Sequence, residues 1–217
     1  MLARHPMLGS RSTIPAMVLT GSTLLMGGCF RIPGPVYGPQ DPSCLESAVF
    51  GDPSDSPYML PFAEGEGFEV FQTYCGPVSH GRDGQMSIDF LMPLGTEVLA
   101  ARSGRVRRLV DGHRDSGRRI NYMYVEHEDG TSAFYAHLME GSYRVSEGDS
   151  VTVGQIVPRS GSSGTSIPHL HFGVSGTWPP THPDDLPVNF KNADGPLDER
   201  GGLERGVVYT ALSREGM

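Results

Sequence analysis

Two histidines separated by one residue, His169 and His171, lie in the segment Pro168-His169-Leu170-His171-Phe172. On an extended strand, residues i and i+2 point to the same face and lie two rises apart, or roughly 6.6 Å. At that spacing one imidazole can hold a metal ion while the other reaches a substrate or a water molecule beside it. Alone the pair is a weak signal, because many surface strands carry one by chance. It gains weight only if an acid and further histidines converge on the same place.

Three more residues of the right types are His80, Asp89 and His137. Catalytic zinc typically takes three nitrogen and oxygen ligands and keeps a fourth position for water, whose pKa falls toward roughly 7. Asp89 lies between Ile88 and Phe90, so we expect its carboxylate to point inward. There a metal, a cation or hydrogen-bond donors must offset its lost hydration. Three cysteines cannot supply an all-thiolate structural zinc site, which excludes that class.

The composition favours a single β-rich domain. A chain of 217 residues is long enough for one ordinary domain with extensions. Its 17 Lys and Arg against 25 Asp and Glu give a net charge of −8, which argues against a nucleic-acid partner. The 29 glycines and 18 prolines separate short clusters of aromatic and β-branched residues, and no long segment has a 3.6-residue period. This pattern is typical of an all-β domain with many turns.

Residues 1–28 have the pattern of an export signal. Arg4 and Arg11 precede a mostly apolar stretch that is too short to span a bilayer comfortably. The stretch ends Leu25-Met26-Gly27-Gly28-Cys29, which resembles a bacterial lipoprotein cleavage box, although methionine is a poor fit at the third position before the cysteine. We expect Cys29 to be lipidated and to anchor the mature chain to a membrane. Plain secretion and an uncleaved anchor are the alternatives.

The other two cysteines are Cys44 and Cys75. If Cys29 carries lipid, they remain as an even pair in an oxidising compartment. We predict a disulfide between them that staples the N-terminal arm to the start of the core domain. Two unrelated buried thiols are the alternative.

The chain divides into three parts: the signal over 1–28, a tether and irregular arm over 29–57, and a core domain with a C-terminal extension over 58–212. Asp129-Gly130 between two strand-like runs is a strong hairpin signal, and the Gly/Ser loop 160–166 is placed to form a cleft wall. Short strands are expected at 94–101 with 104–106, 120–127, 131–138, 145–157, 170–174, 188–190 and 207–210. Seven or more short strands indicate a compact β-barrel or sandwich.

The order of the motifs is specific. Ser-His at 79–80 is followed by Ile-Asp-Phe and Pro-x-Gly-Thr-x-Val-x-Ala-Ala-x-x-Gly-x-Val, then by Tyr-Ala-His-Leu, Gly-x-x-Val-x-x-Gly-Gln and Pro-His-Leu-His-Phe. This set resembles the lysostaphin/LytM-type zinc metalloendopeptidases, which cut peptides of bacterial cell-wall peptidoglycan. The resemblance runs from about residue 58 to 210 and is densest between 80 and 174. It implies an all-β fold, a compact antiparallel barrel-sandwich of duplicated hybrid motifs, with the cleft across one sheet.

The resemblance also implies roles for the five site residues. His80, Asp89 and His171 would bind one zinc ion per chain. His137 and His169 would be the catalytic histidines that orient and deprotonate the attacking water and stabilise the oxyanion on the scissile carbonyl. Which of the two accepts the proton stays open.

One departure from the family pattern concerns the first histidine. The commonest pattern places it four residues before the aspartate, where this chain has Gln85, a poor zinc ligand. His80 instead lies nine residues before Asp89, with a turn expected at 81–84. The spacing resembles a longer-spaced branch of the family. A damaged site that lacks one ligand is the rival explanation.

Two other residues near the motifs have simpler interpretations. We expect His127, at the end of a strand, to be structural. We expect Tyr135 to belong to the core, with donation of its hydroxyl to the oxyanion as the minor alternative.

We therefore predict a zinc-dependent endopeptidase that hydrolyses peptide bonds of peptidoglycan at the bacterial cell envelope. The expected partners are peptidoglycan peptides and, through Cys29, the membrane; the chain is expected to be a monomer, and periplasmic or secreted if not anchored. The main alternative is a catalytically silent envelope protein that binds peptidoglycan or activates another hydrolase. A biotinyl- or lipoyl-type carrier needs an acceptor lysine at a hairpin tip, and the only lysine is Lys191. The sequence leaves open which bond is cut and whether an arm or partner blocks the cleft.

Overall fold

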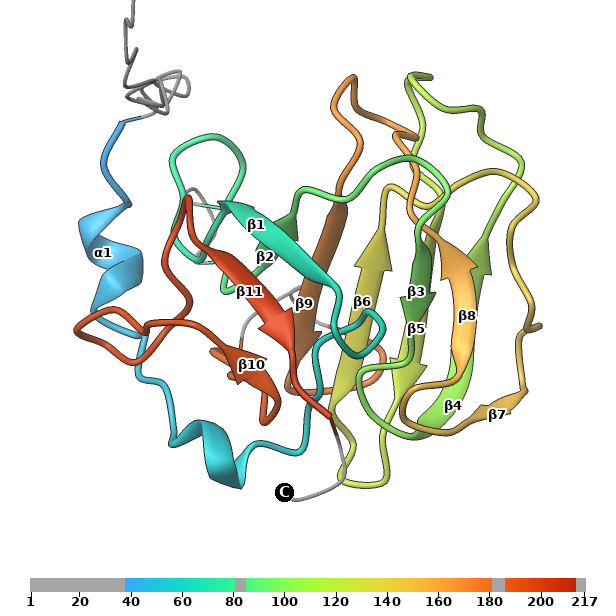
Figure 1. The fold of residues 1–217 in the computed structure, drawn as a ribbon. Coiled ribbons are helices and arrows are strands. Elements are labelled where there is room, and N and C mark those ends of the chain that lie inside the picture. The colour runs from blue at the N-terminus through green and yellow to red at the C-terminus, as the bar shows by residue number, and fades with distance from the viewer. Residues whose placement is uncertain (1–37, 81–84, 181–185, 214–217) are drawn as a thin grey trace, which may run out of the picture. The chain divides into compact units, whose positions relative to one another are not determined.

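The computed structural model describes residues 38–80, 85–180 and 186–213 (Figure 1). The predicted export signal over 1–28, the lipidation site Cys29 and the turn at 81–84 lie outside the described residues. Within the described ranges, no helix combines the length and apolar character that crossing a membrane requires.

Antiparallel β-strands dominate the described part of the chain, which confirms the all-β class. One sheet has the strand order β10-β11-β1-β2-β9-β6-β5-β4-β7, and β3 and β8 form a separate pair. Among the described strands no pairing joins β10 to β7, so the large sheet is open and not a closed barrel. Its strands are β1 (Gly67–Gln72), β2 (Ile88–Phe90), β4 (Gly104–Val110), β5 (Tyr122–Glu126), β6 (Ser132–Ala136), β7 (Ser150–Val151), β9 (Leu170–Ser175), β10 (Ala193–Asp194) and β11 (Val208–Ala211). The separate pair is β3 (Glu97–Leu99) and β8 (Ile156–Arg159).

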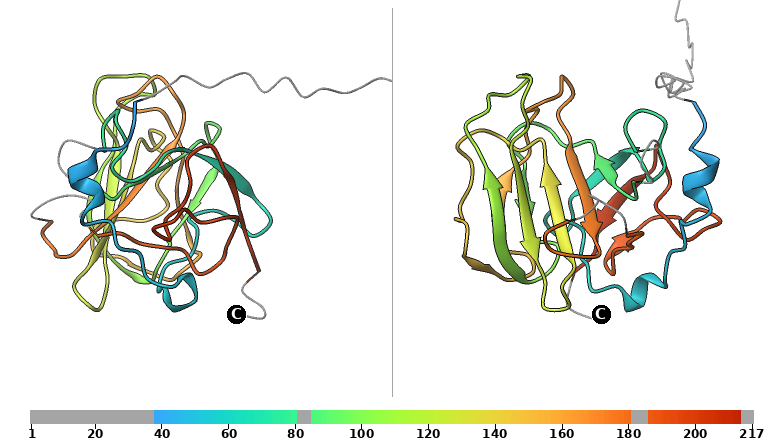
Figure 2. Two further views of the ribbon diagram at one scale, coloured as in Figure 1. Left: turned by 90° about the vertical axis from the view of Figure 1, so that its left-hand side faces the viewer. Right: turned by 180° about the vertical axis from the view of Figure 1, so that it is seen from behind.

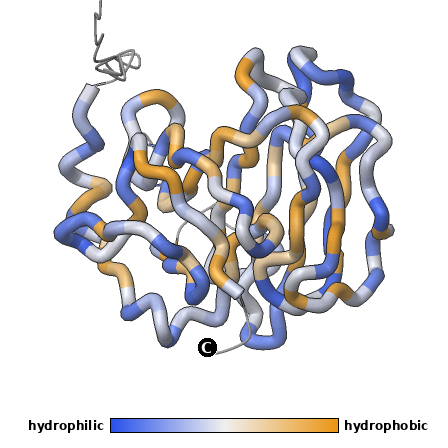
Figure 3. The backbone as a smooth tube through the Cα atoms, viewed as in Figure 1, coloured by the Kyte–Doolittle hydropathy of each residue, from blue (hydrophilic) through white to orange (hydrophobic). Residues whose placement is uncertain are grey.

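The β3–β8 pair lies in front of β4 and β5 in Figure 1 and behind them in the reversed view of Figure 2, so it covers one face of the large sheet, where the main core lies. Hydrophobic and hydrophilic stretches follow one another along the strands (Figure 3). Because side chains alternate along a strand, buried apolar residues recur at every second position of β5 and β9. Met123 of β5 and Phe172 of β9 are fully buried on this face and share the core with Val98 of β3 and Val157 of β8. The opposite face of the same strands is thereby left for polar and functional side chains.

The hairpin predicted at Asp129-Gly130 joins β5 to β6. Gly130 has φ +84°, a left-handed conformation that costs glycine little and other residues more. The pairing places Met123 opposite Tyr135 and Tyr122 opposite Ala136, so adjacent pairs face opposite sides of the sheet.

The arm has more regular structure than the sequence suggested. It contains the short helix α1 (Pro42–Leu45) and the 3-10 turn η1 (Pro53–Asp55). The Asp41 carboxylate accepts from the first backbone amides of α1, and proline at the first helical position has no amide to satisfy. A disulfide joins Cys44 of α1 to Cys75, which follows β1.

The strand predicted at 188–190 is wrong. Phe190 is buried and its ring packs against those of Phe90 and Phe172, at centroid distances of 5.9 and 5.5 Å. The backbone beside it bonds to the start of the core domain, because Lys191 N–H donates to the carbonyl of Tyr58 and not to a neighbouring strand. The apolar pattern therefore reflects core packing without ladder pairing, and β10 begins three residues later.

Tyr135 lies on the core face, which excludes it as a donor to an oxyanion in the cleft. Its ring is fully buried, and its hydroxyl oxygen accepts a 2.8 Å hydrogen bond from the backbone N–H of Ala101. This bond ties β6 to the end of the segment that follows β3.

We predict that Tyr135→Phe lowers the free energy of unfolding by about 1–3 kcal/mol, because the buried N–H of Ala101 loses its acceptor. The measurement is urea unfolding of the metal-free protein, with Tyr122→Phe on the opposite face as the matched control. Equal unfolding free energies for Tyr135→Phe and wild type would contradict this role for the hydroxyl.

Candidate active site

A row of paired residues crosses neighbouring strands of the large sheet and carries two of the predicted metal ligands. Asp89 of β2 pairs with His171 of β9, and His171 pairs with Ala136 of β6. Directly opposed residues of antiparallel strands project from the same face, with Cβ atoms about 4.5–5.5 Å apart. The backbone ladder alone therefore places the Asp89 carboxylate beside the His171 imidazole, on the face away from the main core.

A bulge in β1 adds Gln72 to this row. Val70 pairs with Phe90 but Gln72 pairs with Asp89, so β1 has one extra residue in this stretch. Such a bulge redirects the side chain that follows it. The Gln72 Nε2 donates to Asp89 Oδ2 at 2.9 Å, which leaves Asp89 Oδ1 directed toward the histidines.

Gln72 also holds the chain just before His80. Its Nε2 donates to the Ser79 hydroxyl at 2.9 Å, and its Oε1 accepts from the backbone amides of Val78 and Ser79. One buried amide side chain therefore links Asp89 to the loop that carries the first histidine.

His80 enters the site from that loop and not from a strand. Its Nδ1 lies 3.0 Å from the carbonyl oxygen of Thr73. A carbonyl oxygen only accepts, so Nδ1 carries the hydrogen and Nε2 presents its lone pair to the site. The His80 side chain is fully buried.

The three predicted ligands converge. His80 Nε2 lies 3.2 Å from His171 Nδ1 and 3.3 Å from Asp89 Oδ1, and His171 Nδ1 lies 2.9 Å from Asp89 Oδ1. Zinc bonds of about 2.0–2.1 Å in a tetrahedron place neighbouring ligand atoms about 3.3 Å apart. Three donor atoms at nearly this spacing, all on buried residues, fit a divalent metal ion such as zinc.

Asp89 keeps its negative charge in this environment. Burial alone would raise the pKa of the carboxyl, but the adjacent His80 and the hydrogen bond with His171 outweigh it and hold the pKa well below its usual range. The site therefore provides the anionic ligand that a divalent cation requires.

The other two histidines complete the group from a different side. His169 Nε2 lies 3.9 Å from Asp89 Oδ1, and the ring of His137 lies 4.4 Å from that of His169, centroid to centroid. His137 has φ +60°, an uncommon conformation that breaks the alternation of β6 directly after Ala136. The structure thus brings together all five residues that the sequence singled out, while His127 lies elsewhere and bonds through Nδ1 to the carbonyl of Ser103.

Both of these histidines expose the same nitrogen. The Nδ1 of His137 donates to the carbonyl of Ser163 at 2.7 Å, and the Nδ1 of His169 donates to the carbonyl of Ile167 at 2.7 Å. Each ring therefore keeps its Nε2 as the basic atom. Burial lowers the pKa of His137 to about 4, helped by His169, and burial also lowers the pKa of His169. Both rings are neutral at pH 7 and able to accept a proton.

A cleft of about 510 Å³ is lined by four of the five residues, Asp89, His137, His169 and His171. Gly164 and Thr165 of the Gly/Ser loop form part of its wall. Apolar side chains form much of the remainder, namely Phe71, Val78, Ile120, Tyr124, Phe134 and Ile167.

Sequence reasoning missed Gln72 and Thr73. Gln72 reaches Asp89 only because β1 is bulged, and Thr73 acts through its backbone carbonyl, so neither carries a sequence signal.

A family model described as Peptidase family M23 matches residues 83–183. The matched range contains Asp89, His137, His169 and His171, whereas His80 lies just before it. His80 is therefore placed among the ligands by its distances to Asp89 and His171 and not by the family match.

The chain is similar to lysostaphin from Staphylococcus simulans, with 38% identity over 100 residues that cover 45% of this chain and 20% of lysostaphin. It is also similar to outer membrane antigenic lipoprotein B from Histophilus somni, with 35% identity over 91 residues that cover 42% of this chain and 26% of that protein. The matches thus span only about a fifth to a quarter of these relatives. Among solved structures, the catalytic domain of the antimicrobial peptidase lysostaphin from Staphylococcus simulans has 28% sequence identity and a TM-score of 0.39, covering 51% of this chain and 79% of that one.

The buried environment of His137 predicts a lowered pKa for its ring in the metal-free protein. NMR titration of its ring proton should give a midpoint near pH 4, with the hydrogen on Nδ1 in the neutral form. Because the folded-state pKa is lowered, neutral His137 favours the folded protein above the unfolded pKa of roughly 6.5, and this contribution is lost as the pH falls through about 4. A midpoint near the unfolded value would show that the ring is solvated and not held by Ser163.

Proposed function

We propose that the chain is a zinc-dependent endopeptidase that hydrolyses peptide bonds of bacterial peptidoglycan, because the model described as Peptidase family M23 matches residues 83–183. The observation that carries the proposal is the convergence of His80, Asp89 and His171, with two neutral histidines beside them at the edge of a cleft. The similarity to lysostaphin and the motif order support peptidoglycan as the substrate class.

Zinc is the proposed metal because the donor set is two imidazole nitrogens and one carboxylate oxygen on buried residues. The chemistry that such an ion supplies when bound is Lewis acidity, which polarises a carbonyl group and lowers the pKa of a water molecule. Gln72 and Thr73 hold Asp89 and His80 in the orientation that binding requires.

The two neighbouring histidines handle the proton. With Nδ1 donated to a backbone carbonyl, His137 and His169 each present a basic Nε2 toward the cleft. One Nε2 takes the proton of the attacking water, and an imidazole protonated in this way can donate a hydrogen bond to the oxyanion or a proton to the leaving amine.

The proposed site of action is the cell envelope, with the chain exported and anchored through a lipidated Cys29. The N-terminal pattern of residues 1–29 and the similarity to outer membrane antigenic lipoprotein B support this location. A disulfide in the folded chain is also typical of an exported protein.

The test is digestion of purified peptidoglycan by the zinc-loaded protein, with fragments identified by mass spectrometry. We expect fragments with new amino termini, their loss on addition of a chelator, and their return when zinc is restored. Intact peptidoglycan in all samples, from a protein that retains zinc, would reject the hydrolase and favour a silent wall-binding protein.

His80→Ala should lower zinc affinity by more than about 100-fold, because loss of a residue that merely supports a ligand already costs roughly 10- to 100-fold. His113→Ala is the matched control, since that side chain lies outside the cluster. Elemental analysis of both variants decides the point: equal zinc content in His80→Ala and wild type would reject His80 as a ligand.

A further inference from the structure

The three proposed ligands are held in place by different means. Asp89 and His171 lie on paired strands, so the sheet itself fixes them. His80 lies outside the strands, and its imidazole is oriented by the carbonyl of Thr73. A contact that fixes the backbone at Thr73 therefore helps to fix the first ligand, whereas strand pairing fixes the other two.

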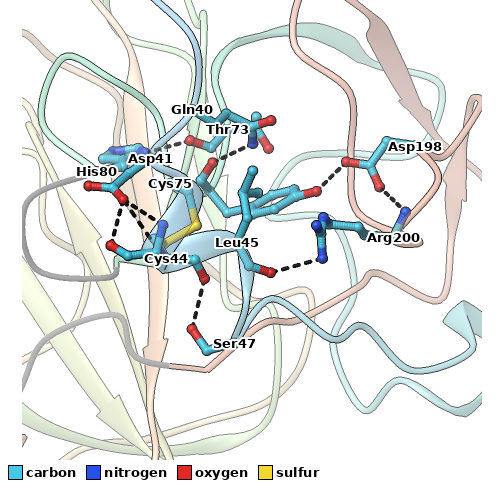
Figure 4. Close-up of a disulfide and its surroundings, with 12 residues drawn as sticks. Gln40, Asp41, Cys44, Leu45, Ser47, Thr73, Cys75, His80, Asp198 and Arg200 are labelled. Atoms are coloured by element: carbon cyan, nitrogen blue, oxygen red, sulfur yellow. Dashed lines mark hydrogen bonds between the residues drawn. A yellow bond between two sulfur atoms is a disulfide. The ribbon is translucent and has the colours of Figure 1, made fainter.

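Residues of the N-terminal arm hold the segment Thr73–Cys75 in place through covalent and hydrogen bonds (Figure 4). The disulfide joins Cys75 to Cys44 of α1, and the backbone N–H of Asp41 donates to the Cys75 carbonyl at 2.9 Å. The Gln40 side chain donates to the Tyr74 carbonyl at 2.7 Å. Cys44, Tyr74 and Cys75 are all buried in one small cluster that is distinct from the main core.

Residues near the C-terminus also hold the segment Thr73–Cys75 through hydrogen bonds. The Thr73 hydroxyl donates to the carbonyl of Leu203 at 2.8 Å, and the Tyr74 hydroxyl donates to the Asp198 carboxylate. The Arg200 guanidinium donates to the carbonyl of Leu45 at 2.9 Å. This bond connects the C-terminal contacts of the segment to those from the arm. The arm and the segment Thr73–Cys75 both lie outside residues 83–183, which the family model matches.

We propose that the Cys44–Cys75 disulfide is a positioning element for metal binding, which holds His80 in ligand geometry through the backbone of Thr73. The inference rests on the proposed function, since it assigns a role in zinc binding to parts of the chain beyond the peptidase domain. It also explains how a histidine nine residues before Asp89 reaches the site without a strand to carry it.

The direct test replaces both cysteines in the full chain, as Cys44→Ser with Cys75→Ser, and measures zinc affinity by competition with a fluorescent chelator. We expect zinc binding about 10- to 100-fold weaker than in wild type, the usual effect of losing support for a ligand. The matched control is Ser56→Ala, which removes a different tether of the arm, the bond from the Ser56 hydroxyl to the carbonyl of Asn189. The control should lower thermal stability without changing zinc affinity.

A spectroscopic measurement separates positioning from general destabilisation. The Co²⁺ absorption spectrum of the double cysteine variant should approach that of His80→Ala, while Ser56→Ala should match wild type. Should the double variant fail to fold, Tyr74→Phe keeps the disulfide, removes the contact with Asp198 and should weaken zinc binding in the same direction. Unchanged zinc affinity in whichever of these variants folds would overturn the proposal.

The outcome is distinguishable from failure of the proposed function. Wild-type protein that binds zinc but leaves peptidoglycan intact would reject the hydrolase and leave the positioning role standing. Wild-type protein that cleaves peptidoglycan, alongside a folded double variant with unchanged zinc affinity, would reject the positioning role alone.

Discussion

The site depends on one register constraint: the pairing of Asp89 with His171 across β2 and β9. A slip of one residue in that pairing would turn Asp89 or His171 to the core face, because side chains alternate along a strand. The same slip would expose Ile88 and Phe172, which are paired in the next position and fully buried. Burial of the apolar face and placement of the ligands on the other face therefore enforce each other.

Around this pair the fold adds residues that a regular sheet would not supply. The bulge in β1 turns Gln72 toward Asp89, the left-handed conformation of His137 turns its ring into the cleft, and the clamped Thr73–Cys75 segment directs His80 inward. Each of these local departures costs conformational energy that hydrogen bonds and core packing must offset. Their concentration at one place is what distinguishes the cleft face from an ordinary polar face of a β-sheet.

The sequence predicted the class of fold, most strands and five residues that the structure brings together, because alternation, turn residues and ordered motifs are local features. It failed where tertiary contacts decide. The apolar pattern at 188–190 marks Phe190 as a core residue and not as part of a strand. No pattern of residues indicates a carbonyl that orients a ligand, so the contribution of Thr73 emerged only from the structure. The sequence predicts a Cys44–Cys75 bridge because two cysteines remain as a pair if Cys29 carries lipid. That count gives no information on how the bridge affects the position of His80.

The most direct measurement is a crystal structure of the zinc-loaded protein with anomalous scattering at the zinc edge. We expect one ion bonded to His80 Nε2, Asp89 Oδ1 and His171 Nδ1 at about 2.0–2.2 Å, with His137 and His169 beside it and not bonded to it. An ion held elsewhere, or a His80 imidazole turned away from Asp89 in the zinc-loaded protein, would contradict it.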